Sequence, residues 1–346
     1  MSIADILLSI LWLALFIYAI FGGADFGAGM LELFAVGASG PRQEALIDES
    51  IGPVWESNHV WLIFLLVVFF TAFPPAFAAI NVVLFIPLLI AVIGIVLRGA
   101  SFVFKTHGII RSSRTVKILS RTFSVASAVT PFFLALTGAA IASGVIVIQS
   151  SSQIVTNTGS DWLTPFTLSV GAMALSLCVT ISAIYLTVEA TTRGETELAE
   201  AFRRRGLVAG ALTAVFGLLG LILSYSEAAF LWHGMLDKAI PIVIITMLVG
   251  IATAAALWFR RYVWARILVV ALTALLLLSW GVSQYPYIIP PDVTAANASS
   301  PLETQQFLLV GIIIALIIVI PSLWFLFYVF KLKKIETDVV HTSAHE

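Results

Sequence analysis

Long apolar runs separated by short polar segments dominate this chain. Each run is about 20 residues long, the length that an α-helix needs to cross the roughly 30 Å hydrocarbon layer of a bilayer. We expect an all-α polytopic fold of about nine transmembrane helices, packed as two four-helix bundles plus one extra helix. The predicted spans are residues 6–35, 51–73, 78–104, 122–148, 162–188, 206–224, 239–258, 263–282 and 305–330.

Composition favours a membrane protein over a soluble one. Hydrophobic residues make up 60% of the chain and charged residues 11%, against roughly 45–50% and about 25% in soluble domains. A net charge of −1 gives no indication of nucleic acid binding, and the single Cys178 excludes a disulfide framework and a multi-cysteine metal site. Asp5 stands where a signal peptide would be basic, so we expect the first apolar run to be retained. The expected organisation is a single membrane domain over residues 1–346.

The basic residues lie on alternate loops, and short cytoplasmic loops are the ones that retain Lys and Arg. Of the 18 basic residues, 16 lie in the first, third, fifth and seventh loops and in the C-terminal tail. They are Arg42, Lys105, Arg111, Arg114, Lys117, Arg121, Arg193, Arg203, Arg204, Arg205, Arg260, Arg261, Arg266, Lys331, Lys333 and Lys334. Lys238 lies on the opposite side and Arg98 lies inside a span. This distribution predicts an external N-terminus and a short cytoplasmic tail over residues 331–346.

Among the ionisable side chains within the predicted spans, the candidates for a structural or functional role are Asp25, Glu56, His59 and Arg98. A charged group there costs about 2.5–3.5 kcal/mol on the insertion scale, so each needs a structural or functional reason. The predicted topology places all four in the cytoplasmic half of the membrane. Glu56 and His59, three residues apart, project from nearly the same helix face, and so do Asp25 and Glu32, seven residues apart.

Two interpretations of these residues stay open. In the structural one, Arg98 neutralises one carboxylate and the other is a protonated packing residue near the interface. In the functional one, Glu56, Asp25 and His59 relay protons inward from the cytoplasm, because buried carboxyl and imidazole groups can titrate near neutral pH. The residues alone indicate a proton or cation path without showing what drives it.

Glycines surround Asp25 in the segment GGADFGAGM at residues 22–30. Gly23 and Gly27 are four residues apart, a spacing typical of close helix packing. Close packing would bring the Asp25 carboxylate against a neighbouring helix.

The distribution of histidines argues against haem bound by this chain alone. A b-type haem with two histidine ligands needs them on facing spans. Only His59 lies within a span, whereas His107 and His233 lie in loops and His341 and His345 in the tail. Ligation by a histidine and a methionine, or ligation shared with a partner, stays open.

Three N-terminal segments carry a specific motif: GGADFGAGML at 22–31, IGPVWESNHVWLIF at 51–64 and TAFPPAFA at 71–78. They resemble subunit 2 of the cytochrome bd quinol oxidases, which has Gly-Phe-Asp-Phe-Gly at the end of its first span. Its second span opens with Gly-Pro-x-Trp-Asp/Glu-x-Asn-x-Val-Trp-Leu. The resemblance covers nearly the whole chain, strongly before residue 105 and loosely after residue 206. Later segments in the family's order are LRGASFVFK at 97–105, TPFFLALTGAAIASGVI at 130–146, YLTVEATTRGETELAEAFRRR at 185–205 and SQYPYIIPP at 283–291.

This resemblance implies a heterodimeric terminal quinol oxidase of the aerobic respiratory chain, in a bacterial inner membrane. The partner subunit 1 would bind two b-type haems and one d-type haem, or a third b-type haem instead, while oxidising quinol and reducing dioxygen to water. The present chain would be the accessory subunit, without haem or catalytic residues of its own. The resemblance also allows a structural quinone and a small single-helix subunit.

The motif match also implies roles for individual residues. Glu56 matches the acidic residue assigned to the family's proton-uptake route, and Asp25 matches the aspartate near it. We therefore predict a proton path through Glu56, Asp25 and His59, with Arg98 as charge partner. The sequence departs from the family pattern at Gly22, where an acidic residue is common, at Ala24 and at His59, which indicates a divergent branch.

Two other functions fit the intramembrane charges. A proton- or cation-coupled secondary transporter would also be expected to have intramembrane carboxylates and kinked helices. A membrane anchor without a role in proton transfer is the third possibility.

Overall fold

The computed structural model describes residues 2–107, 113–144, 146–148, 154–155 and 162–343, and these residues are almost entirely helical. Eight of the helices described are long and apolar enough to cross a membrane, and a bent helix pair adds a ninth if it counts as one span. The predicted all-α fold with about nine spans is confirmed.

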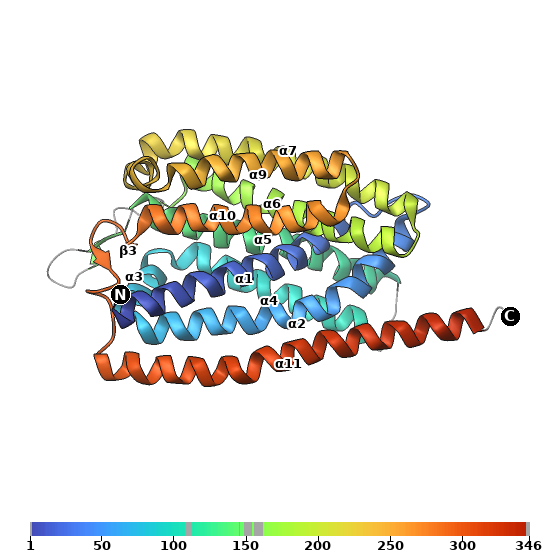
Figure 1. Ribbon diagram of the computed structural model, residues 1–346, viewed down its shortest axis with the longest axis horizontal. Coiled ribbons are helices and arrows are strands. Elements are labelled where there is room, and N and C mark those ends of the chain that lie inside the picture. Colours follow the sequence, from blue (N-terminus) through green and yellow to red (C-terminus); the bar gives the residue numbers. More distant parts are fainter. Residues whose placement is uncertain (1, 108–112, 145, 149–153, 156–161, 344–346) are drawn as a thin grey trace.

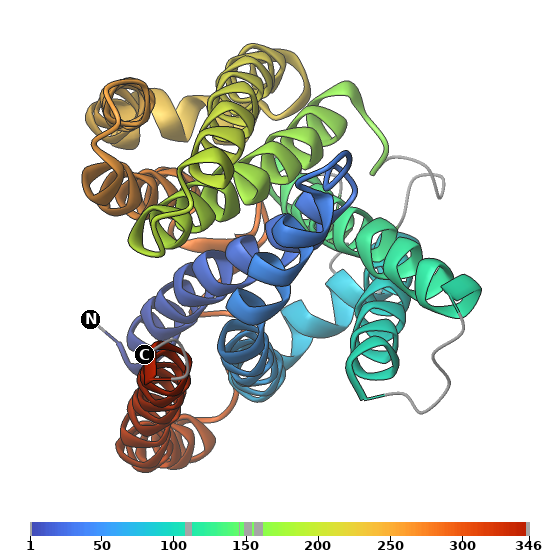
Figure 2. The same cartoon turned by 90° about the vertical axis from the view of Figure 1, so that its right-hand side faces the viewer.

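The long helices lie side by side along the longest axis of the molecule (Figure 1). One group of four comprises α1 (Ile3–Glu32), α2 (Gly40–Ala72), α4 (Phe85–His107) and α5 (Ser113–Ser143). The other comprises α6 (Pro165–Thr192), α7 (Thr196–Glu227), α9 (Ile240–Trp258) and α10 (Tyr262–Gln284). The groups meet where α1 and α5 contact α6, and α11 (Leu302–Ser343) packs outside them against α2 and α1 (Figure 2).

Short elements complete the fold near the loops. They are α3 (Pro74–Val83), α8 (Ala229–Gly234), the π-helical turn η1 (Met235–Ala239), and the antiparallel pairs β1 (Val147–Ile148) with β2 (Ile154–Val155) and β3 (Tyr287–Ile289) with β4 (Val293–Thr294).

The predicted third span, 78–104, is wrong at its start. Residues 78–83 belong to α3, which is bent by 114° from the membrane-spanning part of α2, and α4 begins only at Phe85. The bend has a local cause: Phe73 is not helical, and Pro74 and Pro75 lack the backbone N–H groups that would continue α2. Apolar side chains continue through the bend, so hydropathy alone did not reveal it.

Several helices also extend beyond their predicted spans. The span predicted at 206–224 lies within α7, which begins at Thr196, and the span predicted at 122–148 corresponds to α5, which begins earlier, at Ser113, and ends earlier, at Ser143. Hydropathy marks the stretch that fits the hydrocarbon layer, whereas backbone hydrogen bonding continues a helix into water.

The beginning of α1 and the end of α11 lie at opposite ends of the molecule, as an odd number of crossings requires (Figure 1). We call the end where α1 finishes and α2 begins the inner end, because the basic residues assign it to the cytoplasm. At the other end, Ser2 caps α1 by accepting from the Asp5 N–H, and the Asp5 carboxylate accepts from the Ser2 N–H.

Candidate functional site

Glycines allow α1 to lie in direct contact with its neighbours. A Cβ atom added to Gly27 would lie 2.0 Å from the Cys178 carbonyl oxygen on α6, and one added to Gly29 would lie 2.2 Å from the Ser127 hydroxyl oxygen on α5. Both distances are far too short for a side chain, so these helices approach one another only because glycine is present. The close packing predicted for this segment is confirmed.

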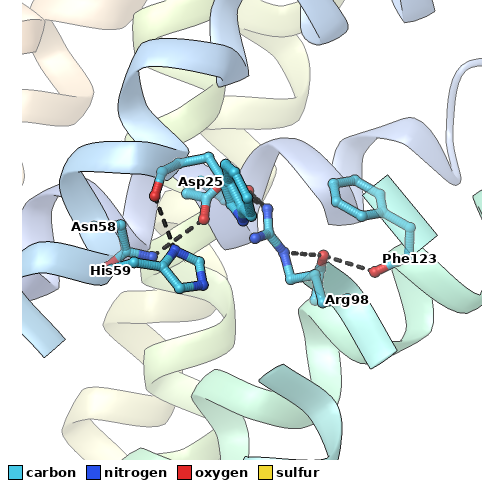
Figure 3. A network of polar contacts seen from close by, with 7 residues as sticks. Asp25, Asn58, His59, Arg98 and Phe123 are labelled. Carbon is cyan, nitrogen blue, oxygen red and sulfur yellow. Dashed lines mark hydrogen bonds and ion pairs between the residues drawn. The ribbon is translucent and has the colours of Figure 1, made fainter. Parts of the chain in front are cut away.

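Asp25 and Arg98 form an ion pair between α1 and α4 (Figure 3). The Arg98 Nη2 atom lies 2.5 Å from Asp25 Oδ1, and the two side chains are 2% and 0% exposed. The same nitrogen also donates to the Asp25 carbonyl oxygen at 3.2 Å. Charges this deeply buried are tolerated when they are paired and hydrogen-bonded, and this arrangement provides both.

The Arg98 guanidinium is fixed from a third helix, α5. Its Nε atom donates to the Ser127 hydroxyl oxygen at 2.9 Å, and that hydroxyl donates to the Phe123 carbonyl at 2.7 Å. The rings of Phe123 and Phe26 lie 4.7 and 5.0 Å from the guanidinium carbon, within range of cation–π attraction. Arg98 thereby joins α1, α4 and α5 at one level of the bundle.

Asn58 of α2 connects to the same pair, because its Nδ2 atom donates to Asp25 Oδ2 at 3.1 Å. Both carboxylate oxygens of Asp25 therefore accept hydrogen bonds, one from Arg98 and one from Asn58. Asn58 and Ser127 were not predicted from the sequence, because neutral polar side chains carry no charge penalty that would single them out. The position of Asn58 between Glu56 and His59 in the α2 motif was the available signal.

His59 lies beside this network on α2 (Figure 3). Its Nδ1 atom is 2.9 Å from the Trp55 carbonyl oxygen, and its ring centre is 4.9 Å from that of Trp55. A carbonyl oxygen only accepts, so Nδ1 carries the hydrogen and Nε2 is the accepting nitrogen of the neutral ring. The side chain of Glu56 lies outside the described residues, while its backbone belongs to α2 one turn before His59.

A small cavity of about 10 Å³ lies between α1, α2 and α4. Its polar lining consists of Tyr18, Asn58, His59 and Arg98, and apolar side chains form the remainder. This volume is close to the lower limit for one water molecule. Arg98 of the buried ion pair thus borders a small cavity that has polar groups in its lining.

A second set of charges lies at the inner end. Lys105 of α4 contacts Glu32 at the end of α1 at 2.8 Å and Asp48 of α2 at 3.0 Å. The Lys105 and Glu32 side chains are only 13% and 4% exposed, whereas Asp48 is 43% exposed. Glu32, which was expected to share a helix face with Asp25, therefore has its own cationic partner.

Nearer to water, Arg42 of α2 pairs with Glu195 and Glu197, which lie at the turn between α6 and α7. The hydrogen bond from Arg42 to Glu195 raises the pKa of Arg42 above its usual value. These contacts connect the two helix groups at the inner end.

Within the described residues, no group of three or more His, Cys, Asp and Glu side chains is placed to hold a metal ion. The residues brought together are a fixed ion pair, a carboxamide, an imidazole and a phenol beside a small cavity.

Comparison with known proteins identifies the family. Residues 3–330 match the family model described as cytochrome bd terminal oxidase subunit II. A Bacillus subtilis (strain 168) protein named as subunit II of a cytochrome bd menaquinol oxidase is 23% identical over 96% of both chains. The Escherichia coli (strain K12) cytochrome bd-I ubiquinol oxidase subunit 2 is 24% identical over 89% of each chain.

A solved structure gives the same result. A chain of the bd oxidase from Geobacillus thermodenitrificans superposes with a TM-score of 0.80 and 26% sequence identity, covering 95% of this chain and 99% of that one. The resemblance predicted from the motifs is confirmed, and it selects the oxidase over the transporter alternative. The chain belongs to the cytochrome bd terminal oxidase subunit II family and is a multi-pass membrane subunit of a bd quinol oxidase.

Proposed function

We propose that this chain is the accessory subunit that supports a haem-bearing subunit I in quinol oxidation and reduction of dioxygen to water, and that it supplies protons from the cytoplasm. The proposed route enters at the inner end, passes Glu56 and continues to His59. The haems, two of b type and one of d type or a third of b type, are proposed to lie in the partner.

One observation carries this proposal: His59, one turn beyond Glu56 on α2, lines a small cavity together with Arg98 of the buried ion pair. Because Nδ1 is held by the Trp55 carbonyl, Nε2 is the nitrogen able to accept a proton. A neutral imidazole beside a cavity with other polar groups is suited to accept a proton and release it.

Asp25 has a supporting role in this proposal. Its two carboxylate oxygens are engaged by Arg98 and Asn58, so the residue holds both side chains at the edge of the cavity. Arg98 supplies the compensating charge. We thus propose Glu56 and His59 as the groups that carry protons, and Asp25 and Arg98 as the fixed pair beside them.

The decisive experiment replaces Glu56 by Gln in the assembled complex. Gln keeps the size and hydrogen bonding of Glu but cannot carry a proton through a turnover. We expect quinol-dependent oxygen consumption to fall by about 100-fold, the lower end of what a positioned proton-transfer group contributes, with haem content unchanged. Glu56→Asp should retain part of the activity, because it keeps a carboxylate.

Glu44→Gln is the matched control, since Glu44 is an exposed carboxylate on the same helix. It should leave oxygen consumption unchanged. Full turnover by the Glu56→Gln complex would reject Glu56 as a proton carrier. Loss of assembly in that variant would instead favour a purely structural carboxylate.

A further inference from the structure

Two buried polar atoms, on residues that line the cavity between α1, α2 and α4, have no hydrogen-bond partner among the described residues. They are the Tyr18 hydroxyl oxygen and Asn58 Oδ1. Tyr18 is 8% exposed and Asn58 is 2% exposed, so neither atom is satisfied by bulk solvent or lipid headgroups. Buried polar atoms in folded proteins are almost always paired, either with protein or with an ordered water.

The orientation of Asn58 follows from its other contact. Asp25 Oδ2 is a carboxylate oxygen and accepts hydrogen bonds, so the amide nitrogen of Asn58 must be the atom that faces it. The amide oxygen is then the atom left over. It is an acceptor that needs a donor, and the Tyr18 hydroxyl can both donate and accept.

His59 also lines the cavity. Its Nδ1–H donates to the Trp55 carbonyl, so in the neutral ring the remaining nitrogen, Nε2, is an acceptor. One water molecule in this cavity would accept from the Tyr18 hydroxyl and donate to Asn58 Oδ1 and His59 Nε2. Three hydrogen bonds are typical of a buried water, and the cavity volume of about 10 Å³ is at the lower limit for one.

We propose that Tyr18, Asn58 and His59 hold a single ordered water molecule, and that Tyr18 positions this water against His59. The functional part of the inference rests on the proposed proton route, because the water would be the next hydrogen-bonded group after His59 on that route. Tyr18 is then a positioning residue, acting through the water rather than carrying protons itself.

The test uses the whole oxidase complex with Tyr18→Phe, which removes the hydroxyl and keeps the ring. Tyr225→Phe is the matched control, because Tyr225 is 69% exposed and does not line the cavity. A high-resolution structure of the unaltered complex should show a water within hydrogen-bonding distance of Tyr18 and Asn58. The Tyr18→Phe complex should lack this water, and its turnover should fall about 3- to 10-fold, the range expected for loss of one hydrogen bond.

Infrared spectroscopy gives a readout that a packing role of Tyr18 would not change. The reduced-minus-oxidised difference spectrum of the unaltered complex should contain a water O–H stretching band that shifts in heavy-oxygen water. The band should persist in Tyr225→Phe and be absent in Tyr18→Phe. Because the unaltered complex is measured first, the site is tested even if Tyr18→Phe assembles poorly.

The outcomes separate this inference from the proposed function. A complex without water beside Tyr18 and Asn58, or a Tyr18→Phe complex with the water and turnover unchanged, would overturn the inference while leaving the Glu56 route intact. Full turnover by Glu56→Gln would remove the proton route and with it the functional part of the inference. The water site itself would then stand on the structural measurement alone.

Discussion

The Asp25–Arg98 pair lies inside the helix bundle, whereas the Arg42–Glu195 pair lies at the inner end near water. Asp25 and Arg98 are 0% and 2% exposed, whereas Arg42 and Glu195 are 49% and 39% exposed. Both pairs join a carboxylate to a guanidinium, so their chemistry is the same. The difference lies in what surrounds them after one partner is lost: apolar helices for Asp25, and water with its ions for Glu195.

The Lys105–Glu32 pair is intermediate, because its side chains are 13% and 4% exposed and Lys105 also contacts the more exposed Asp48. The three sites therefore form a series of decreasing burial within one chain. We expect that the burial of each pair, rather than the number of ion pairs, determines how much stability is lost when one partner is removed.

The largest effect is expected for Arg98→Met. Met approximates the apolar length of Arg but leaves the buried Asp25 carboxylate without its cation, a change that typically costs about 3–5 kcal/mol. We expect the complex to be obtained in low yield and its thermal unfolding midpoint to fall sharply. The measurement is the midpoint of the purified complex together with the yield of assembled subunit.

The double variant Asp25→Asn with Arg98→Met is the control for this prediction. It removes both charges and keeps a group able to accept from Asn58, so much of the lost stability should return. A double variant as unstable as Arg98→Met would contradict the explanation by an uncompensated charge. The packing of Arg98 against Phe26 and Phe123 would then be the main contribution.

The sequence was sufficient to predict the approximate positions of the membrane-spanning helices. Hydropathy is a local property, so the approximate positions of the spans followed from apolar runs of about 20 residues. The spacing of Gly23 and Gly27 likewise predicted close packing, since small residues at that spacing lie on one helix face. The α3 bend was missed because apolar residues continue through it, although Pro74 and Pro75 were the signal.

The identity of each charge partner was not predictable in the same way. Arg98 could have paired with Asp25 or Glu56, and the choice depends on how α4 is rotated against α1 and α2, which no local pattern encodes. Arg42 contacts Glu195 across 153 residues of sequence for the same reason. Tyr18, Asn58 and Ser127 were missed because neutral polar residues are common in membrane helices and their significance depends on what they face.

A smaller effect is expected for Lys105→Met. The substitution removes the cation that contacts the buried Glu32 carboxylate, but Glu32 lies at the end of α1, where a small movement gives it access to water. Loss of a hydrogen bond to a charged group contributes about 1–3 kcal/mol, so the unfolding midpoint should fall by less than in Arg98→Met. Lys117→Met, at an exposed position on α5, is the control and should leave the midpoint unchanged. A change equal to that of Arg98→Met would mean that Glu32 is held as rigidly as Asp25.

The smallest effect is expected for Arg42→Gln. Glu195 and Glu197 remain hydrated when Arg42 is lost, and ions screen exposed charges over about 8 Å at physiological ionic strength. We expect no measurable change in the unfolding midpoint at physiological salt, and a small decrease relative to the unaltered complex at low ionic strength. Arg42→Lys keeps the charge and should show neither change. A salt-independent decrease in the unfolding midpoint of Arg42→Gln would mean that the geometry of this contact, rather than screened attraction, holds α2 against the α6–α7 turn. Burial would then not explain the contribution of the exposed pair.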